Sequence, residues 1–175
     1  MADMTIGTIL FTEEQIQKRA EELGAQITKD YQGEELVLIG TLKGAILWMA
    51  DLMKRIDLDT EIDFIVASSY GKNTTTSGIV KISKDVELDL EGKHVLIVED
   101  IVDSGVTLKR LTEYFAERKA KSVKVCSLLD KPSRRITDIK PDYLGFEVED
   151  LFIIGYGLDF DQKYRNLPYI SYLES

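Results

Sequence analysis

Several features are missing from this 175-residue chain, and each absence narrows what the protein does. A single cysteine, Cys126, excludes an intrachain disulfide, and its place in the apolar run 123–129 predicts a buried thiol. No apolar run approaches the roughly 20 residues that span a bilayer. The N-terminus also lacks the basic segment followed by an apolar one that marks a secretory signal. We therefore expect a soluble, unexported protein of the cytoplasm with no membrane partner.

Positive charge is scarce as well. The chain has 31 acidic against 22 basic side chains and a net charge of −9, which disfavours a broad electrostatic grip on nucleic acid. An anionic ligand must therefore be bound locally. There is no repeat, no Walker phosphate loop and no G-x-G-x-x-G fingerprint, which disfavours ATP and NAD as cofactors. At 175 residues we expect one domain, residues 1–175, with a sizeable core.

Strand and helix patterns alternate over most of the chain. Thr12 and Gln15 form a capping box that opens a helix running toward Asp30. Alternation of this kind predicts an α/β fold, with a mostly parallel sheet flanked by helices. After Pro141 short strands follow without a helix between them, and we expect this segment, from about residue 140, to form a small hood over the carboxyl ends of the strands together with the N-terminal residues. The predicted strands are 36–39, 62–69, 79–82, 95–98, 123–129, 143–148 and 151–154, and the predicted helices are 12–30, 46–53 and 106–119.

One short stretch carries the strongest functional pattern. An apolar strand at 95–98 leads into the acids Glu99, Asp100 and Asp103, and then into a hydroxyl-rich, glycine-containing loop at 104–107 that opens a helix. Ligands of open α/β sheets bind outside the carboxyl ends of the strands, and a helix N-terminus attracts anions, so a phosphate fits this loop. Acids beside a phosphate make sense if they bind hydroxyls or a divalent cation, or take a proton. The pattern therefore predicts a sugar-phosphate site.

Taken one at a time, the same residues have ordinary structural explanations. Asp103 or Ser104 suits a helix N-cap, and Glu99 with Asp100 suits a solvated strand end. Neighbouring strand residues also point to opposite faces, so Glu99 and Asp100 serve one ligand only if the chain leaves extended geometry there. The ordered run of strand, acids, hydroxyl loop and helix is what favours a site.

This run resembles a known signature. Four apolar residues, Glu-Asp, two residues, Asp, Ser or Thr, Gly, any residue and Thr is the phosphoribosyl pyrophosphate signature of the purine phosphoribosyltransferases, and residues 95–107 match it throughout. The resemblance covers most of the chain and favours the hypoxanthine-guanine branch. It implies the type I phosphoribosyltransferase fold and a homodimer or homotetramer. The further matching segments are Leu42-Lys43-Gly44, Ser69-Tyr70, Lys131, Phe152 onward through Gly155-Tyr156, Leu158-Asp159 and Arg165.

The resemblance implies a reaction. Ribose 5-phosphate passes from 5-phosphoribosyl 1-pyrophosphate to N9 of hypoxanthine or guanine, giving IMP or GMP and pyrophosphate, with Mg²⁺ as cofactor. It assigns Glu99 and Asp100 to the ribose hydroxyls and to the metal with its waters, and Asp159 to a second Mg²⁺. Asp103 becomes the general base that accepts the purine N7 proton. The 5-phosphate is then held by Ser104, Gly105, Val106 and Thr107, mostly through backbone N–H groups.

The resemblance also assigns the pyrophosphate. Leu42-Lys43-Gly44 and Arg165 would bind it, and the family often has a non-proline cis peptide before this lysine, which a sequence does not reveal. Ser69 and Tyr70 match a loop that closes over the reacting centre and excludes water. We expect residues 70–78 to form a mobile loop. For Lys43 a solvated charge is the alternative, and for Arg165 a structural ion pair.

The resemblance assigns purine binding to a second group of residues. By resemblance Lys131 would donate to the purine O6, which favours hypoxanthine and guanine over adenine. Phe152 would stack on the base and the Ile153 backbone would meet its edge. The alternatives are a surface lysine, a core phenylalanine and, for Asp159, a loop acid. His94 has no partner in the motif, and we interpret it as structural.

Two rival functions remain open at this point. Regulators that keep the same motif as a sensor and bind DNA or RNA usually carry a basic surface or an added DNA-binding domain, and this acidic chain shows neither. A phosphoribosyltransferase for another base is the second rival. Lys131 and the Phe152 segment disfavour adenine and orotate but leave xanthine open.

Overall fold

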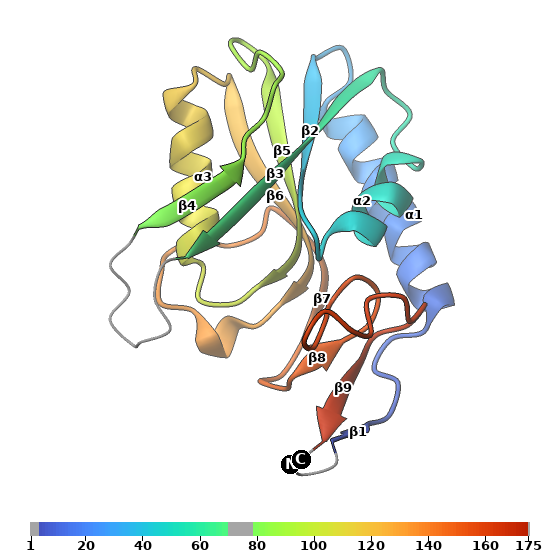
Figure 1. The fold of residues 1–175 in the computed structure, drawn as a ribbon. Helices are drawn as coiled ribbons and strands as arrows, with labels where there is room; N and C mark the ends of the chain where they lie inside the picture. Colours follow the sequence, from blue (N-terminus) through green and yellow to red (C-terminus); the bar gives the residue numbers. More distant parts are fainter. Residues whose placement is uncertain (1–3, 70–78, 175) are drawn as a thin grey trace.

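The structure is a computed structural model that describes residues 4–69 and 79–174 (Figure 1). A six-stranded sheet has the order β4-β3-β2-β5-β6-β7, and all its pairings are parallel except that of β4 with β3. The predicted α/β fold with a mostly parallel sheet is confirmed. The elements are β1 (Thr5–Ile6), α1 (Glu13–Asp30), β2 (Leu36–Thr41), α2 (Ile46–Met53), β3 (Thr60–Ser69), β4 (Val80–Lys84), β5 (His94–Val102), α3 (Val106–Glu117), β6 (Ser122–Asp130), a 3-10 turn (Pro132–Arg134), β7 (Tyr143–Glu147), β8 (Ile153–Ile154) and β9 (Ser171–Glu174).

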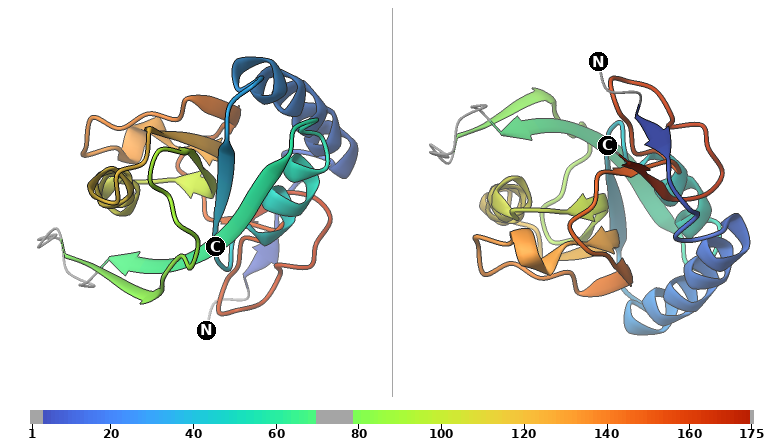
Figure 2. Two further views of the ribbon diagram at one scale, coloured as in Figure 1. Left: turned by 90° about the horizontal axis from the view of Figure 1, so that it is seen from above. Right: turned by 90° about the horizontal axis from the view of Figure 1, so that it is seen from below.

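Helices cover both faces of this sheet. Figures 1 and 2 show α1 and α2 on one side and α3 on the other. The central strand β2 is apolar and buried from residue 36 to residue 40, as expected of a strand between two helical layers. Its Leu38 belongs to the core under α1 and α2, whereas its Ile39 belongs to the core under α3. Two apolar cores therefore hold the carboxyl ends of the strands in fixed positions.

Several local predictions agree with the structure. The capping box is present, since Thr12 Oγ1 accepts from the Gln15 backbone and the Gln15 side chain accepts from the Thr12 backbone. Cys126 is buried, and burial raises the pKa of its thiol to about 12, which fits a core position. His94 lies edge-on to Tyr31 and its Nδ1 bonds the Ser122 hydroxyl, which supports a structural role.

The predicted extent of the hood was wrong on one side. Tyr143, expected in the hood, is buried and pairs with Cys126, so β7 is the sixth strand of the main sheet. The usual helix is missing before this parallel strand, because a 3-10 turn and an extended segment make the crossover from β6. A helix-free connection is what made β7 look like a hood strand in the sequence.

The hood itself is a separate three-stranded sheet. Its order is β1-β9-β8, so the first and last strands of the fold pair with each other. Figure 1 shows it beyond the carboxyl ends of β2 and β5. The predicted loop at 70–78, including Tyr70, lies outside the described residues. No helix in the described parts of the chain is long and apolar enough to cross a membrane.

Candidate active site

The carboxyl ends of β2, β5 and β6 meet beneath the hood, and two pockets open there. One, of about 250 Å³, is bounded by the turn after β2 (Thr41, Leu42 and Gly44) and by the acid pair Glu99 and Asp100. The other, of about 110 Å³, is lined by Glu99 and by residues 101–105 and 107–108. A larger pocket of about 630 Å³ lies at the opposite edge of the sheet, at the amino ends of β2 and β3, and contains none of the predicted site residues.

The loop after β5 has the geometry of an anion cradle. Gly105 is the N-cap of α3, in the left-handed region at φ 84°, and its cap position forms no side-chain hydrogen bond. Neither Asp103 nor Ser104 is therefore the N-cap residue, although Ser104 Oγ accepts from the Val106 backbone N–H at 3.4 Å. Val106 and Thr107 begin the first turn of α3, whose backbone N–H groups have no intrahelical partners. Such a turn offers several donors to one anion.

A wall that sequence reasoning missed supports this loop. It is the segment 135–139, directly after the 3-10 turn. The Ser104 carbonyl accepts from the Ile136 backbone at 3.0 Å. A Cβ added at Gly105 would lie 2.3 Å from the Thr137 hydroxyl and 2.7 Å from an Ile139 methyl. Glycine is therefore required at 105 twice over, for its φ and for the contact behind it.

Glu99 and Asp100 lie at the entrance to the cradle and are linked to each other. A Glu99 carboxylate oxygen accepts from the Thr41 hydroxyl at 2.7 Å and from the Asp100 backbone N–H at 3.0 Å. Burial, and then the negative charge of Asp100, raise the pKa of Glu99 well above its usual range. The chain does not leave extended geometry here, because β5 continues to Val102, yet Glu99 and Asp100 both line the first pocket. That both acids serve one ligand stays a prediction.

The turn after β2 is pressed between the acids and the hood. A Cβ at Gly44 would lie 1.8 Å from Asp100 Oδ2, and a Cβ at Gly157, in the hood, would lie 2.1 Å from the Gly44 carbonyl oxygen. The peptide bond between Leu42 and Lys43 is cis. The structure thus brings Leu42-Lys43-Gly44 and Asp100 together at one edge.

Lys43 reaches a polar cluster in the hood. Its Nζ donates to Gln162 Oε1 at 3.1 Å, and the same oxygen accepts from Arg165 at 3.1 Å. Arg165 also donates to the Gly157 carbonyl at 2.7 Å and pairs with Asp159 at 3.2 Å. Gln162 was missed by sequence reasoning, because glutamine in a polar loop carries no signal of its own. Arg165 Nε is buried without a partner among the described residues.

The structure contradicts the alternative explanations for two residues that were predicted to bind the purine. Lys131 is only 8% exposed, and its Nζ donates to the Leu151 carbonyl at 2.6 Å, so it is no surface lysine. Phe152 is 53% exposed and lies edge-on to Phe160, so it is no core residue. Ile153 is buried in β8, directly after Phe152.

Asp103 is held differently from the acid pair. Its side chain is 48% exposed and pairs with Arg134 Nε at 3.3 Å, while its backbone carbonyl accepts from Arg135 at 3.1 Å. Arg134 also pairs with Asp150 at 3.5 Å. The carboxylate therefore faces solvent at the mouth of the pocket that Gly105 and Ser104 line. Ser69 ends β3, at the same carboxyl edge of the sheet.

A divalent cation fits the acid pair. The unneutralised charge that raises the pKa of Glu99 comes partly from Asp100, and a cation beside them would remove that repulsion. Carboxylate oxygens are hard donors of the kind that Mg²⁺ takes. Within residues 4–69 and 79–174 no three His, Cys, Asp or Glu side chains group as ligands, so water and substrate oxygens would complete the coordination shell.

Comparison with known proteins agrees with this geometry. The family model of the phosphoribosyl transferase domain matches residues 8–161. The chain is 55% identical over 169 residues to the hypoxanthine-guanine phosphoribosyltransferase of Bacillus subtilis, covering 97% of this chain and 94% of the relative. The chain belongs to the hypoxanthine-guanine phosphoribosyltransferase family. It is a transferase of purine salvage and works by phosphoribosyl transfer.

Solved structures of this family share the fold. A crystal structure of a hypoxanthine phosphoribosyltransferase from Staphylococcus aureus matches with a TM-score of 0.94 and 50% identity, over 97% of this chain and 92% of that one. A hypoxanthine-guanine phosphoribosyltransferase from Bacillus anthracis matches with a TM-score of 0.92 and 46% identity, over 99% and 100%. The type I phosphoribosyltransferase fold expected from the sequence is thereby confirmed.

Proposed function

We propose that the chain transfers ribose 5-phosphate from 5-phosphoribosyl 1-pyrophosphate to N9 of hypoxanthine or guanine and so forms IMP or GMP. The proposal rests on the left-handed N-cap at Gly105, which has no side chain to cap α3 and lies beside the acid pair. Within the described residues, only the Val106 N–H of this turn has a side-chain acceptor, the Ser104 hydroxyl at 3.4 Å. A monoester bound to the amides of 104–107 would place its ribose next to Glu99 and Asp100.

The acid pair is proposed to bind the sugar and would also hold the Mg²⁺. Glu99 and Asp100 accept hydrogen bonds from the ribose 2- and 3-hydroxyls and hold the metal directly or through water. Mg²⁺ bound there supplies positive charge that stabilises the departing pyrophosphate. Asp159 is proposed to hold a second Mg²⁺, which its position in the polar cluster with Arg165 supports.

Asp103 moves the proton. As the bond from C1 of the ribose to pyrophosphate breaks, N9 of the base forms a bond to C1, and the N7 proton passes to the Asp103 carboxylate. Such general-base catalysis contributes roughly 10²–10⁴-fold in rate. The half-exposed carboxylate at the pocket mouth supports this role.

Two hood residues and one residue of β6's carboxyl end recognise the base. Lys131 Nζ exchanges the Leu151 carbonyl for the purine O6, which adenine lacks. Phe152, exposed beside Phe160, stacks on the ring, and the Ile153 backbone meets its edge. Adenine offers an amino group in place of O6, so a base bound in this position would separate Lys131 from the Leu151 carbonyl without replacing the acceptor, which disfavours adenine.

The pyrophosphate is bound from two sides. The Leu42-Lys43-Gly44 turn supplies one side, and Arg165 in the hood supplies the other. The shared contact of Lys43 and Arg165 with Gln162 supports the proposal, because it brings both cations to one place. Ser69 and Tyr70 are proposed to close over the reacting centre, although Tyr70 lies outside the described residues.

The setting of the enzyme is part of the proposal. Residues 1–175 act as one phosphoribosyltransferase domain, as a homodimer or homotetramer, in the cytoplasm. Exposed apolar side chains on the hood, Met4, Ile6 and Ile9, support association of copies. Sedimentation analysis of the purified chain measures this, and a monomer at micromolar concentration would contradict it.

A panel of bases tests the function. Purified protein is incubated with 5-phosphoribosyl 1-pyrophosphate, Mg²⁺ and one of hypoxanthine, guanine, xanthine or adenine, and nucleotides are separated by chromatography. We expect IMP and GMP, and no AMP. Equal use of adenine would remove Lys131 from its role. No nucleotide with any base, together with tight binding of nucleic acid, would favour the regulator instead.

A further inference from the structure

Arg135 lies in the wall behind the phosphate cradle, and none of the roles above uses it. Its side chain is only 11% exposed and forms an ion pair with Asp130, whose side chain is equally buried. Arg135 Nε donates to the Asp103 carbonyl at 3.1 Å, and its terminal nitrogens donate to the Ile139 carbonyl and to Asp130. One guanidinium thus ties the end of β6, the cradle and the segment before β7 to one another.

The stem of the same side chain packs against the cradle. A Cβ added at Gly105 would lie 2.9 Å from Arg135 Cδ. The planar guanidinium fork fixes the direction of each hydrogen bond, which a flexible lysine would not do. The backbone at Asp103 and Gly105 is therefore held from behind by a rigid group, while the Asp103 side chain stays exposed on the other side.

We infer that Arg135 is a positioning residue for phosphoribosyl pyrophosphate, and that it keeps the turn at 103–105 in the shape that directs the amides of 104–107 at the phosphate. The inference rests on the proposed function of that loop. Without Arg135, the Asp103 carbonyl loses a charged donor and Asp130 is left buried without its counterion. The turn then samples other conformations, and the cradle binds phosphate less well.

The neighbouring Arg134 does not duplicate this role. It contacts the Asp103 carboxylate rather than the backbone, its side chain is 55% exposed, and it divides its charge between Asp103 and Asp150. Exposed pairs of this kind contribute little to a fixed geometry. The two adjacent arginines therefore separate into a backbone support, Arg135, and a side-chain contact, Arg134.

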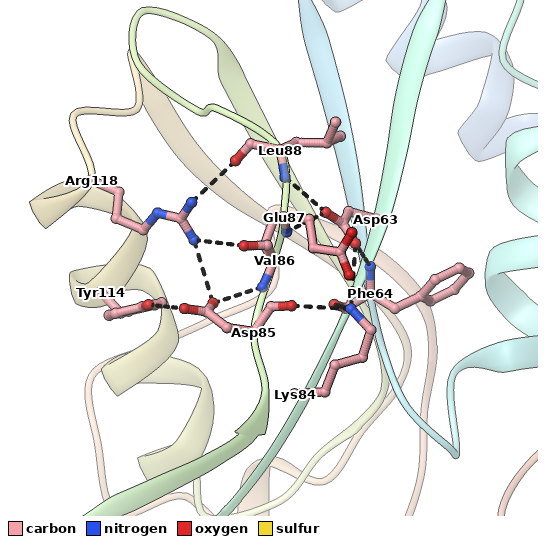
Figure 3. A network of polar contacts seen from close by, with 9 residues as sticks. All are labelled: Asp63, Phe64, Lys84, Asp85, Val86, Glu87, Leu88, Tyr114 and Arg118. Atoms are coloured by element: carbon pink, nitrogen blue, oxygen red, sulfur yellow. Dashed lines mark hydrogen bonds and ion pairs between the residues drawn. The ribbon is translucent and has the colours of Figure 1, made fainter.

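A matched control exists elsewhere on the chain. Arg118, at the far end of α3, is also largely buried, donates to the carbonyls of Val86 and Leu88 at 3.3 and 3.1 Å, and pairs with Asp85 (Figure 3). It ties α3 to the segment after β4, as Arg135 ties the cradle to its wall. The network in Figure 3 includes no predicted site residue.

The test compares steady-state kinetics of Arg135→Gln, Arg135→Lys and Arg118→Gln. For Arg135→Gln we expect the KM for phosphoribosyl pyrophosphate to rise about tenfold or more, equivalent to about 1.4 kcal/mol, with the KM for hypoxanthine within about twofold of wild type. Arg135→Lys keeps a positive charge for Asp130, so its KM for phosphoribosyl pyrophosphate should lie between those of wild type and Arg135→Gln. Arg118→Gln should lower the melting temperature and leave both KM values unchanged.

A second readout does not depend on catalysis. In ligand-free protein, amide NMR resonances of residues 104–107 should shift in Arg135→Gln and stay in place in Arg118→Gln. Unshifted resonances, or an Arg135→Gln enzyme whose KM for phosphoribosyl pyrophosphate matches wild type, would overturn the inference. A wild-type enzyme that forms no nucleotide would instead overturn the proposed function, and the NMR comparison would still decide whether Arg135 shapes the turn.

Discussion

The phosphate cradle and the hood differ in what holds them. In the cradle, residues 99–107 continue a buried strand directly into a helix, so β5 and α3 fix both ends of the turn that Arg135 supports from behind. In the hood loop, residues 155–165, the backbone forms no helix or strand, and its path is held by hydrogen bonds across tight turns, such as that from the Gly157 N–H to the Arg165 carbonyl at 2.9 Å. Residues at positive φ, Gly155, Tyr156 and Gly157 among them, make these turns. Regular structure thus positions the groups proposed to bind the sugar phosphate, and loops and turns position most of the groups proposed to bind the pyrophosphate and the base.

The hood loop is also attached to the layer of α1 and α2. Gly157 packs closely against the Gly44 carbonyl, and the Tyr156 hydroxyl donates to Asp51 on α2, which also accepts from Gln17 on α1 at 2.8 Å. The hood loop is thus attached to both helices of one layer. Substitutions in the cradle should therefore alter binding or turnover, and substitutions in the hood attachments should alter stability first.

Asp103→Asn, in the cradle, should have the largest effect of the variants, and the effect should be on turnover. The amide does not accept the N7 proton, so turnover should fall by roughly 10²–10⁴-fold. The KM for phosphoribosyl pyrophosphate should change little, because the cradle backbone is untouched. Steady-state kinetics measures both constants. Asp150→Asn, which pairs with the same Arg134, is the control and should keep most of its turnover.

Gly157→Ala tests the hood side. The new methyl group would lie 2.1 Å from the Gly44 carbonyl oxygen, at φ 98°. Gly33→Ala is the matched control, because Gly33 has φ 79° and nothing within 4 Å of an added Cβ. The control should lose roughly 1–2 kcal/mol of stability from the backbone alone, and Gly157→Ala roughly 1–3 kcal/mol more from the clash. Urea unfolding measures the difference, and equal losses would show that the hood and the turn after β2 are not packed together.

Tyr156→Phe removes the attachment to α2. Loss of a hydrogen bond to a charged group should cost roughly 1.5–3 kcal/mol of unfolding free energy near neutral pH. Burial opposes the charge of Asp51, but hydrogen bonds from Tyr156, Lys54 and Gln17 lower its pKa below the usual value.

The pH dependence of this loss has a defined sign. A carboxylate with a lowered pKa in the folded state stabilises the fold above its unfolded pKa, about 3.9, and loses that contribution as the pH falls through its folded value. The stability difference between wild type and Tyr156→Phe should therefore shrink below about pH 4. A difference that stays constant down to pH 2.5 would mean that the hydroxyl does not act through the ionised Asp51.

Glu99→Gln should give the smallest change in stability, and it should stabilise the fold rather than destabilise it. The raised pKa of Glu99 means that its charge destabilises the ligand-free fold once the pH exceeds the unfolded pKa, about 4.3. The variant should therefore melt higher than wild type at pH 8, by about 2–4 °C for each 1 kcal/mol recovered, while losing activity. The gain should vanish near pH 4. An unchanged or lower melting temperature at pH 8 would show that the acid pair carries no electrostatic strain.

The sequence predicted the cradle better than the hood for the same physical reason. Strand, acids and helix of the cradle are adjacent along the chain, so local patterns at 95–107 describe the whole unit. Pairings between distant residues have no such pattern. That is why the contact of Gln162 with Lys43, 119 residues away, and the contact of Arg135 with the Asp103 carbonyl, 32 residues away, were not foreseen. The strand β7 was expected in the hood because no helix precedes it. The acid pair was foreseen, but the folding back of Glu99 onto the Asp100 N–H was not.

A crystal structure with 5-phosphoribosyl 1-pyrophosphate and Mg²⁺ would show whether the turn at Gly105 binds the 5-phosphate. We expect phosphate oxygens about 3 Å from the backbone nitrogens of 104–107, with the ribose hydroxyls toward Glu99 and Asp100. A bound ligand whose 5-phosphate sits elsewhere, with the turn at Gly105 empty, would contradict this expectation.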